Sequence, residues 1–243
     1  MTDPAPSGAP ATQVSVWEDL VDIWYTPAAV FARRQQGAFW VPLVVVTVVL
    51  GGLFLLNSRL LAPMMDAEFD RGMAAAMRAN PQLTPEMAER GRAFGTMFAR
   101  IGAFVFVPIA VFCTGLALWL LGKLVEAKES FGTALAVAAY AYVPRVLEAL
   151  LAGIQGLLLD PDSLDGRYRV SLGIGRFLDP DTVSPVLLAV VGRVDVFTLW
   201  ITVLLAVGLS VTGKISRSNA AVAAGLVWVV GALPTLLPAL RAA

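Results

Sequence analysis

Two charged residues lie inside a long apolar run of this sequence, where proton transfer or transport chemistry would need them. Arg145 and Glu148 follow Pro144 within the segment 131–159. An unpaired charge at membrane depth costs at least about 2.5–3.5 kcal/mol on insertion scales, so such groups indicate a substrate or proton site by default. The structural alternative is either mutual pairing at a proline kink, because residues three apart share a helix face, or a tilt of the helix that brings both residues to an interface. We favour pairing, since opposite charges one turn apart neutralise each other.

Three more side chains complete the candidate intramembrane site. Asp195 precedes another apolar stretch, where it could be a polar partner inside the bundle. The favoured alternative is a helix N-terminal carboxylate stabilised by the macrodipole, with Arg193 as a further partner. Tyr142 and Trp200 could line a cavity, although aromatic packing at an interface explains them more simply. The candidate site consists of Tyr142, Pro144, Arg145, Glu148, Asp195 and Trp200.

The usual catalytic and metal-binding motifs are missing. The chain has no histidine, which excludes Ser-His dyads, HExxH zinc sites and His-ligated haem. Its one cysteine, Cys113, lies in an apolar run and is interpreted as core filler. There is no Walker A or GxGxxG pattern. We therefore expect no catalytic residue, no cofactor and no metal.

An acidic loop is the one place where a divalent cation could bind. Its carboxylates lack the ligand order of a calcium loop, so a solvated acidic turn is the favoured interpretation. The residues concerned are Asp160, Asp162, Asp165, Asp179 and Asp181.

The composition is that of a membrane protein. Hydrophobic residues make up 58% of the 243 residues and charged residues only 15%, against about 45–50% and 25% in soluble domains. The formal net charge is zero, so nothing indicates nucleic acid. Several apolar runs could cross a hydrocarbon core roughly 30 Å thick, and only helices can do so here. The lipid bilayer is therefore the first expected partner.

These runs predict an all-α polytopic integral membrane protein with five transmembrane helices. We expect a disordered tail over 1–14, juxtamembrane amphipathic helices over 15–36 and a five-span domain over 37–243. The expected spans are about 38–56, 101–121, 131–159, 196–211 and 220–240. The apolar segment 183–191 is too short to span.

The segment before the first span predicts an interfacial amphipathic helix. Ser15 and Glu18 have capping-box spacing, and Thr26-Pro27 restarts a helix that Arg33-Arg34 end. One face is expected to be apolar and the other acidic. The apolar face comprises Trp17, Leu20, Val21 and Trp24, and the acidic face comprises Glu18, Asp19 and Asp22.

The charged region 57–100 separates the first two spans. Asn80-Pro81 divides it, and Thr84-Pro85-Glu86 starts a second helical piece. That piece continues directly into the second span, so one long helix should emerge from the membrane, with a possible bend at Pro108.

The positive-inside rule gives two opposing indications of the orientation. A raw count of basic residues opposes a cytoplasmic N-terminus, whereas the basic density of the short turns favours it. Those turns hold Lys123, Lys128, Lys214 and Arg217. Acidic residues at the N-terminus argue against a cleavable signal peptide. We expect a multi-pass protein of a bacterial inner membrane with a cytoplasmic N-terminus.

Three stretches resemble the Yip domain family, whose eukaryotic branch was named for interacting with Ypt/Rab GTPases. They are Trp24-Tyr25-Thr26-Pro27 with Phe31, the stretch from Phe131-Gly132 to Ala139-Tyr140-Ala141-Tyr142-Val143-Pro144, and Asp195-Val196-Phe197-Thr198-Leu199-Trp200 followed by Gly208, Lys214 and Ser216. The resemblance implies five spans, a cytoplasmic N-terminus and an organising role in membranes rather than catalysis. The charged 57–100 region and the Arg145/Glu148 pair depart from the family pattern. Bacteria lack Rab proteins, so that partner does not carry over to a bacterial member.

The sequence therefore predicts a non-enzymatic protein that organises or regulates a membrane or a membrane complex, with a membrane-protein partner. The alternative is a small permease or transporter subunit that uses the Arg145/Glu148 region. An enzyme with a membrane-embedded acid site ranks third.

Overall fold

A computed structural model describes residues 15–80 and 82–242 of the chain, and every regular element within them is a helix. The predicted tail over 1–14 lies outside the described residues. The elements are α1 (Val16–Asp22), α2 (Pro27–Arg33), α3 (Trp40–Asn57), α4 (Ala62–Ala79), α5 (Pro85–Lys123), α6 (Phe131–Ala141), α7 (Pro144–Leu158), η1 (Pro161–Ser163), η2 (Ile174–Phe177), α8 (Pro185–Val191), α9 (Val196–Gly213), α10 (Arg217–Val230) and α11 (Leu233–Ala242).

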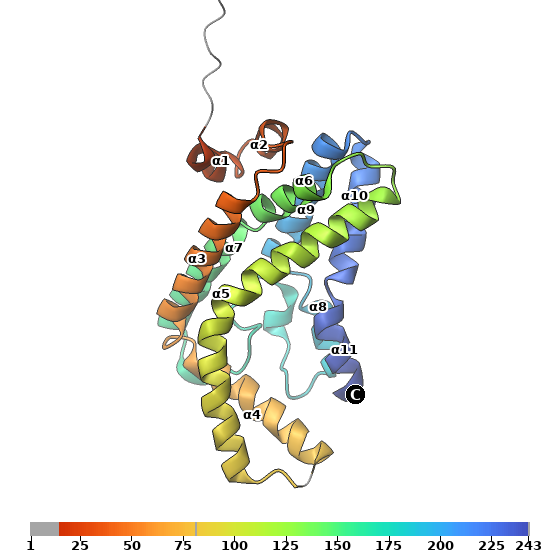
Figure 1. The fold of residues 1–243 in the computed structure, drawn as a ribbon. Helices are drawn as coiled ribbons and strands as arrows, with labels where there is room; N and C mark the ends of the chain where they lie inside the picture. The colour runs from red at the N-terminus through yellow and green to blue at the C-terminus, as the bar shows by residue number, and fades with distance from the viewer. Residues whose placement is uncertain (1–14, 81, 243) are drawn as a thin grey trace, which may run out of the picture.

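Five helical segments are long and apolar enough to cross a membrane, which confirms the predicted fold class. They are α3, most of α5, α6 with α7, α9, and α10 with α11, and their mean hydropathies lie between 1.5 and 2.4. Figure 1 shows α1 and α2 at one end of the bundle and α4 at the other. We call these ends the hairpin side, with the turns 34–39, 124–130 and 214–216, and the loop side, with α4 and residues 159–184.

Side-chain caps fix where several helices begin. Ser15 forms the predicted capping box with Glu18. Ser130, Asp195 and Ser216 each accept a hydrogen bond from a backbone N–H in the first turn of α6, α9 and α10. These polar residues satisfy amide groups that have no partner within a helix, so each span starts at a defined residue.

Helix α6 is the centre of the bundle. Every residue from Thr133 to Ala141 is buried, and most of them are small. Two glycines on neighbouring helices admit its larger side chains: a Cβ at Gly115 of α5 would lie 2.7 Å from Leu135, and one at Gly208 of α9 would overlap Val137. Small residues let helix backbones approach closely in membranes. Residues 133–141 of α6 are therefore shielded from lipid by the surrounding helices.

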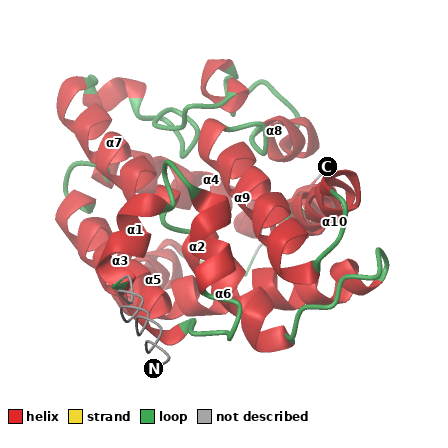
Figure 2. Cartoon of the chain, turned by 90° about the horizontal axis from the view of Figure 1, so that it is seen from above, coloured by secondary structure: helices red, strands yellow, loops and turns green. Residues whose placement is uncertain are grey.

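The N-terminal hairpin, α1 with α2, covers this central helix on the hairpin side. Figure 2 shows α2 over the middle of the bundle, between α3 and α9. Ile23, Val30 and Phe31 are fully buried there. Phe31 contacts the backbone of α9, because a Cβ at Gly208 would lie 3.3 Å from its ring. The hairpin is thus part of the packed core and does not merely rest on the membrane surface.

The structure corrects the predicted faces of α1. Asp19 was assigned to an exposed acidic face, but its side chain is fully buried. Arg33 and Arg34 neutralise it, with Nη2 of Arg33 2.7 Å from Oδ1 and Nε of Arg34 2.5 Å from Oδ2. Trp17 and Val21, on the predicted apolar face, are 65% and 60% exposed, which leaves them accessible to an interface or a partner as that prediction requires. Polarity alone misassigned Asp19 because its cationic partners follow more than ten residues later.

Two of the spans are broken helices. The third span ends its first helix before Tyr142 and resumes at Pro144, which confirms the predicted kink. The fifth span is interrupted at Gly231 and Ala232. Pro234, which has no backbone N–H to donate to a helical hydrogen bond, follows two residues later. Helix α5, in contrast, is continuous over 39 residues although Pro108 lies inside it. The predicted long helix that joins the charged region to the second span is therefore present.

Candidate functional site

The break in the third span positions Tyr142 and Pro144. The N–H of Tyr142 donates to the carbonyl oxygen of Ala138, 3.1 Å away, and closes the last turn of α6. Its phenolic oxygen lies 3.0 Å from Oγ1 of Thr114 on α5. Pro144 takes the first position of α7, where a missing N–H costs nothing. Both predicted residues therefore shape the bend, and Tyr142 ties it to a neighbouring span.

Arg145 and Glu148 form the ion pair predicted from their spacing. Nη1 of Arg145 lies 2.5 Å from Oε2 of Glu148, and Nη2 donates to Oγ1 of Thr198 on α9 at 3.4 Å. Both residues lie near the start of α7, the second helix of the third span. The two charges are paired and hydrogen-bonded, which is how ionised side chains are tolerated within a span.

Asp195 is the N-cap of α9, as the favoured sequence interpretation held. Its buried Oδ1 accepts from the N–H of Phe197 at 2.9 Å and of Thr198 at 3.4 Å. The segment in front of it pairs with residues 173–174: the N–H of Ile174 donates to the carbonyl of Val194 at 3.1 Å. Asp195 therefore joins the start of α9 to the loop-side segment.

Arg193 has a role that sequence reasoning missed. It was suggested as a partner of Asp195, but its Nη2 donates to the carbonyl oxygen of Trp228 at 2.9 Å, and its guanidinium lies 5.6 Å from the centre of the indole. The N–H of Ala232 bonds to Val229, one residue short of the helical pattern, so the carbonyl of Trp228 would otherwise lack a donor. Arg193 thus caps the broken end of α10. The glycine and proline at 231 and 234 were the available signal for this break.

Trp200 does not join the polar cluster. Its indole packs edge-on against Trp24, with ring centres 5.0 Å apart and planes at 88°. Trp24 lies between α1 and α2, so this contact attaches the N-terminal hairpin to α9. Trp200 is therefore found in aromatic packing, as the simpler of its two sequence interpretations predicted.

Arg145 borders two cavities. One of about 350 Å³ lies between α3, α4 and α7 and includes Phe54, Asn57 and Glu148 in its wall. The other, about 100 Å³, has Tyr142, Arg193 and Trp228 in its wall. The first is large enough for an apolar chain, and the second for a few water molecules. This arrangement can hold an ion pair between two spaces, but it presents no nucleophile with an adjacent base.

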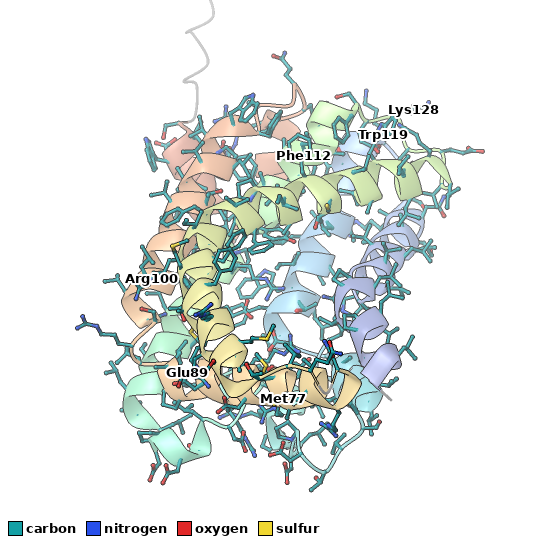
Figure 3. The ribbon with its side chains drawn as sticks, turned by 60° about the horizontal axis from the view of Figure 1, so that its bottom comes forward. Met77, Glu89, Arg100, Phe112, Trp119 and Lys128 are labelled. Carbon is teal, nitrogen blue, oxygen red and sulfur yellow. The ribbon has the colours of Figure 1, made fainter. Side chains whose placement is uncertain are left out.

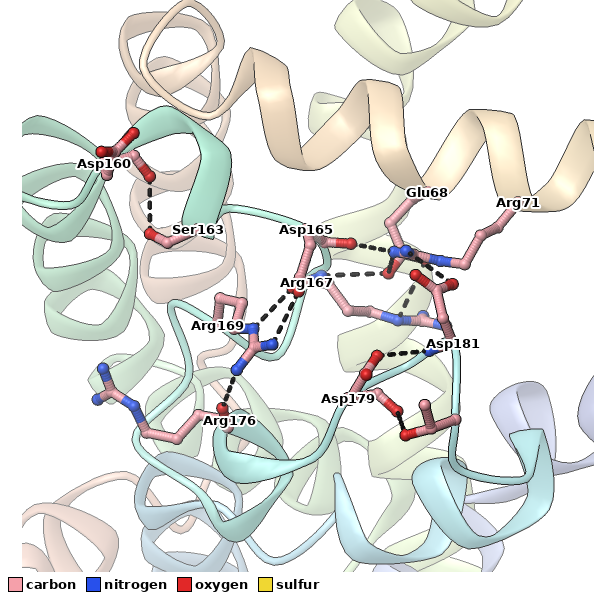
Figure 4. A network of polar contacts seen from close by, with 11 residues as sticks. Glu68, Arg71, Asp160, Ser163, Asp165, Arg167, Arg169, Arg176, Asp179 and Asp181 are labelled. Carbon is pink, nitrogen blue, oxygen red and sulfur yellow. Dashed lines mark hydrogen bonds and ion pairs between the residues drawn. The ribbon is translucent and has the colours of Figure 1, made fainter.

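The acidic loop is held by arginines rather than arranged around a cation (Figure 4). Arg169 donates to both carboxylate oxygens of Asp165, at 2.6 and 2.7 Å, and these hydrogen bonds lower the pKa of Asp165 from its ordinary 3.8. Arg71 of α4 donates to the backbone of the same aspartate and pairs with Asp181 at 3.6 Å. Within the described residues no three His, Cys, Asp or Glu side chains converge. The loop is a structured cross-link between α4 and residues 165–181.

A buried carboxyl on the hairpin side also escaped the sequence reasoning. Glu129 is 5% exposed, and neither of its carboxylate oxygens has a hydrogen-bond partner. A Cβ at Gly122 would lie 2.9 Å from Oε1, and one at Gly213 would lie 2.7 Å from Oε2. Lys123, the nearest cation, donates instead to the carbonyls of Ala127 and Glu129, both at 2.9 Å. Burial therefore raises the pKa of Glu129 above its ordinary 4.5. No local sequence pattern marks this burial.

A family model described as Yip1 domain matches residues 21–237. No curated protein and no solved structure matched the chain.

Proposed function

The chain belongs to the Yip1 domain family, and from this premise we propose that it organises or regulates a membrane or a membrane-protein complex without catalysing a reaction. We further propose that it lies in a bacterial inner membrane with the hairpin side facing the cytoplasm. The multi-pass fold supports both proposals, as do the short basic turns on the hairpin side. Its partners in this role are the bilayer and another membrane protein.

The observation that carries the proposal is the way the N-terminal hairpin is mounted. Buried contacts of Asp19, Ile23 and Phe31 fix it to the bundle, while Trp17 and Tyr25 project outward. Large aromatic side chains held on a rigid support are typical of membrane interfaces and of protein contacts. The charged groups of the candidate site, in contrast, each have a partner within the bundle: Arg145 pairs with Glu148, and Asp195 and Arg193 bind helix ends. The hairpin is therefore the surface best suited to an encounter with a partner.

Site-specific photo-crosslinking in native membranes tests this proposal. A photoreactive amino acid at Trp17 or Tyr25 should give protein adducts, whereas the same group at the exposed Lys128, in the turn 124–130, should give none. A partner identified by mass spectrometry would set the biological context. If both hairpin positions gave only lipid adducts, and reconstituted protein left liposome morphology unchanged, the proposed role would lose its basis.

One observation favours a second candidate, a small permease or transporter subunit. Arg145 lies in the wall of both cavities, and its partner Glu148 lies in the wall of the larger one. A pair that opened would connect the two spaces. Proteoliposome flux that survives Arg145→Ala and Glu148→Ala unchanged would exclude this path.

A further inference from the structure

Helix α5 extends well beyond the membrane on the loop side. Its 39 residues at about 1.5 Å each reach about 58 Å, almost twice the roughly 30 Å hydrocarbon core. The first part is charged, which keeps it in water. The charged residues are Glu86, Glu89, Arg90, Arg92 and Arg100. Figure 3 shows Glu89 and Arg100 toward one end of α5 and Phe112 and Trp119 toward the other.

This extension has little support from the rest of the molecule. Arg92 pairs with Asp66 at 2.6 Å and with Asp70, both on α4. A Cβ at Gly91 would have only the end of Met73, 3.9 Å away, within reach. Most of the stability of a helix in a protein comes from packing of its apolar face, and the extension gains little of this from its own chain.

An apolar stripe runs along the exposed side of the extension and into the span. We call it the outer stripe, and its spacing alternates between four and three residues. Its side chains other than glycine are 49–60% exposed. The outer stripe consists of Met87, Gly91, Phe94, Phe98, Ile101 and Val105. This period of 3.5 residues is the seam of a coiled coil, in which each helix needs a neighbour with the same repeat.

The outer stripe points away from α4. Successive residues of a helix are about 100° apart, so Phe94 lies about 200° and Phe98 about 240° around the axis from Arg92. Arg92 faces Asp66 and Asp70, which places the two phenylalanines on the opposite side. Helix α4 reaches the stripe only beside Gly91, through the end of Met73, and leaves the larger stripe side chains uncovered.

We propose that the outer stripe is a parallel dimer interface with α5 of a second copy of this chain. Two copies in one bilayer share the same orientation, so a two-fold axis along the membrane normal brings the stripe against itself in register. No stripe position is charged, so this contact buries no like charges. Gly95, one turn from Gly91, has nothing within 4 Å of a would-be Cβ and leaves room for a neighbouring backbone.

Lipid alone does not account for the lower part of the stripe. Met87, Phe94 and Phe98 precede Arg100, and the charges among them place this stretch on the water side of the interface. Contiguous exposed apolar side chains outside the bilayer mark an interaction site. The second copy covers them with the same residue types in the same repeat.

Disulfide formation between single cysteines tests the interface. A Cys113→Ser background removes the one native cysteine. Phe94→Cys and Phe98→Cys place a thiol on the stripe, whereas Ala93→Cys and Thr96→Cys place one on the other side of the same helix turns. Mild oxidation in native membranes should give a species of twice the chain mass for the first two variants and not for the controls. Equal yields on both faces, or no dimer from the stripe, would overturn the proposal.

A second measurement needs no crosslink. In lipid nanodiscs the Phe94→Glu and Phe98→Glu variants should lower the dimer fraction about tenfold or more, because each buries an unpaired carboxylate at the seam. Thr96→Glu is the matched control and should stay dimeric. A monomeric wild-type protein, or a stripe cysteine that links only to a different protein, would also overturn the proposal. The interface does not depend on the proposed function, since dimerisation can fail while the hairpin still finds its partner.

Discussion

Nε of Arg34 lies 2.5 Å from Oδ2 of Asp19, a residue fifteen positions earlier whose side chain is fully buried. The contact closes the N-terminal hairpin from inside. Arg33 approaches the other oxygen of the same carboxylate, so two cations at the C-terminal end of α2 compensate one buried anion on α1.

Removing that anion should be among the most destabilising single changes in the hairpin. Asp19→Ala removes the buried carboxylate that both guanidinium groups contact, and a hydrogen bond to a charged group contributes about 1.5–3 kcal/mol. Chemical unfolding in detergent, followed by tryptophan fluorescence, measures the loss. Asp22→Asn is the control: Asp22 also pairs with Arg33 but is 38% exposed, so its loss should cost at most about 1 kcal/mol. Equal effects of the two variants would contradict the buried geometry.

Glu129 should make the protein less stable as the pH rises. Its pKa is raised in the folded state because the carboxyl is buried, so the folded protein holds a proton that the unfolded chain releases near pH 4.5. The neutral form carries no penalty at low pH, and stability is lost as the pH rises through the raised value. Lys123 opposes this shift, whereas Glu126, Lys128, Lys214 and Arg217 are exposed to solvent.

The Glu129→Gln variant tests this dependence. It should be more stable than the wild type at neutral pH, and its unfolding midpoint should vary less between acidic and neutral pH. Glu126→Gln, an exposed neighbour in the same turn, should behave like the wild type. A Gln variant with the wild-type pH profile would show that the carboxyl is ionised when folded.

Asp165 should have the opposite pH dependence. Hydrogen bonds from Arg169 lower its pKa in the folded protein, so its stabilising contribution is present above pH 3.8 and lost as the pH falls through the lowered value. The pair is partly exposed, which limits the contribution to about 1 kcal/mol. A double-mutant cycle of Asp165→Asn and Arg169→Gln, measured at neutral and acidic pH, should give a coupling only at the higher pH. A coupling that persisted in acid would refute the assignment.

Arg193 should stabilise the broken end of α10. Arg193→Ala leaves the carbonyl of Trp228 without its donor, and an unsatisfied buried acceptor costs about 1–3 kcal/mol. Thermal unfolding in nanodiscs measures the loss. Arg217→Ala, at the exposed start of the same helix, should change little. If both substitutions were equally mild, the cap would have no energetic importance.

The proposed orientation predicts opposite sides for the two chain ends, because five spans separate them. A reporter that is active only outside the cytoplasm should be active when fused to the C-terminus and inactive when fused before Ser15. The reverse pattern would invert the proposed topology and leave the fold unchanged.

The sequence predicted the spans well because their length and apolar character are local properties. Pro144 predicted the kink, and the three-residue spacing predicted the Arg145–Glu148 pair. Asp195 had the residue type and the position of an N-cap. In each case the cause lies within a few residues of the effect.

The rest depended on contacts distant in sequence. The sequence placed Asp19 on an acidic helix face, whereas in the structure Arg33 and Arg34 pack over it and pair with its carboxylate. Glu129 is buried only because Gly122 and Gly213, on two different helices, converge beside it. Arg193 meets the carbonyl of Trp228, 35 residues later, and no spacing rule relates the two. Such relationships are set by the packing of whole helices, which periodicity in one segment does not contain.

The burial of α6 determines which helices contact the lipid acyl chains. The third span has the lowest mean hydropathy of the five, 1.5, and the largest buried share, 56%. Alanine gains little from hydrocarbon compared with leucine or phenylalanine. The annulus of acyl chains is therefore contacted mainly by the flanks of α3, α5 and α10. Substituting bulkier apolar residues into α6 would raise the hydrophobicity of that segment but would disrupt its packing against the neighbouring helices.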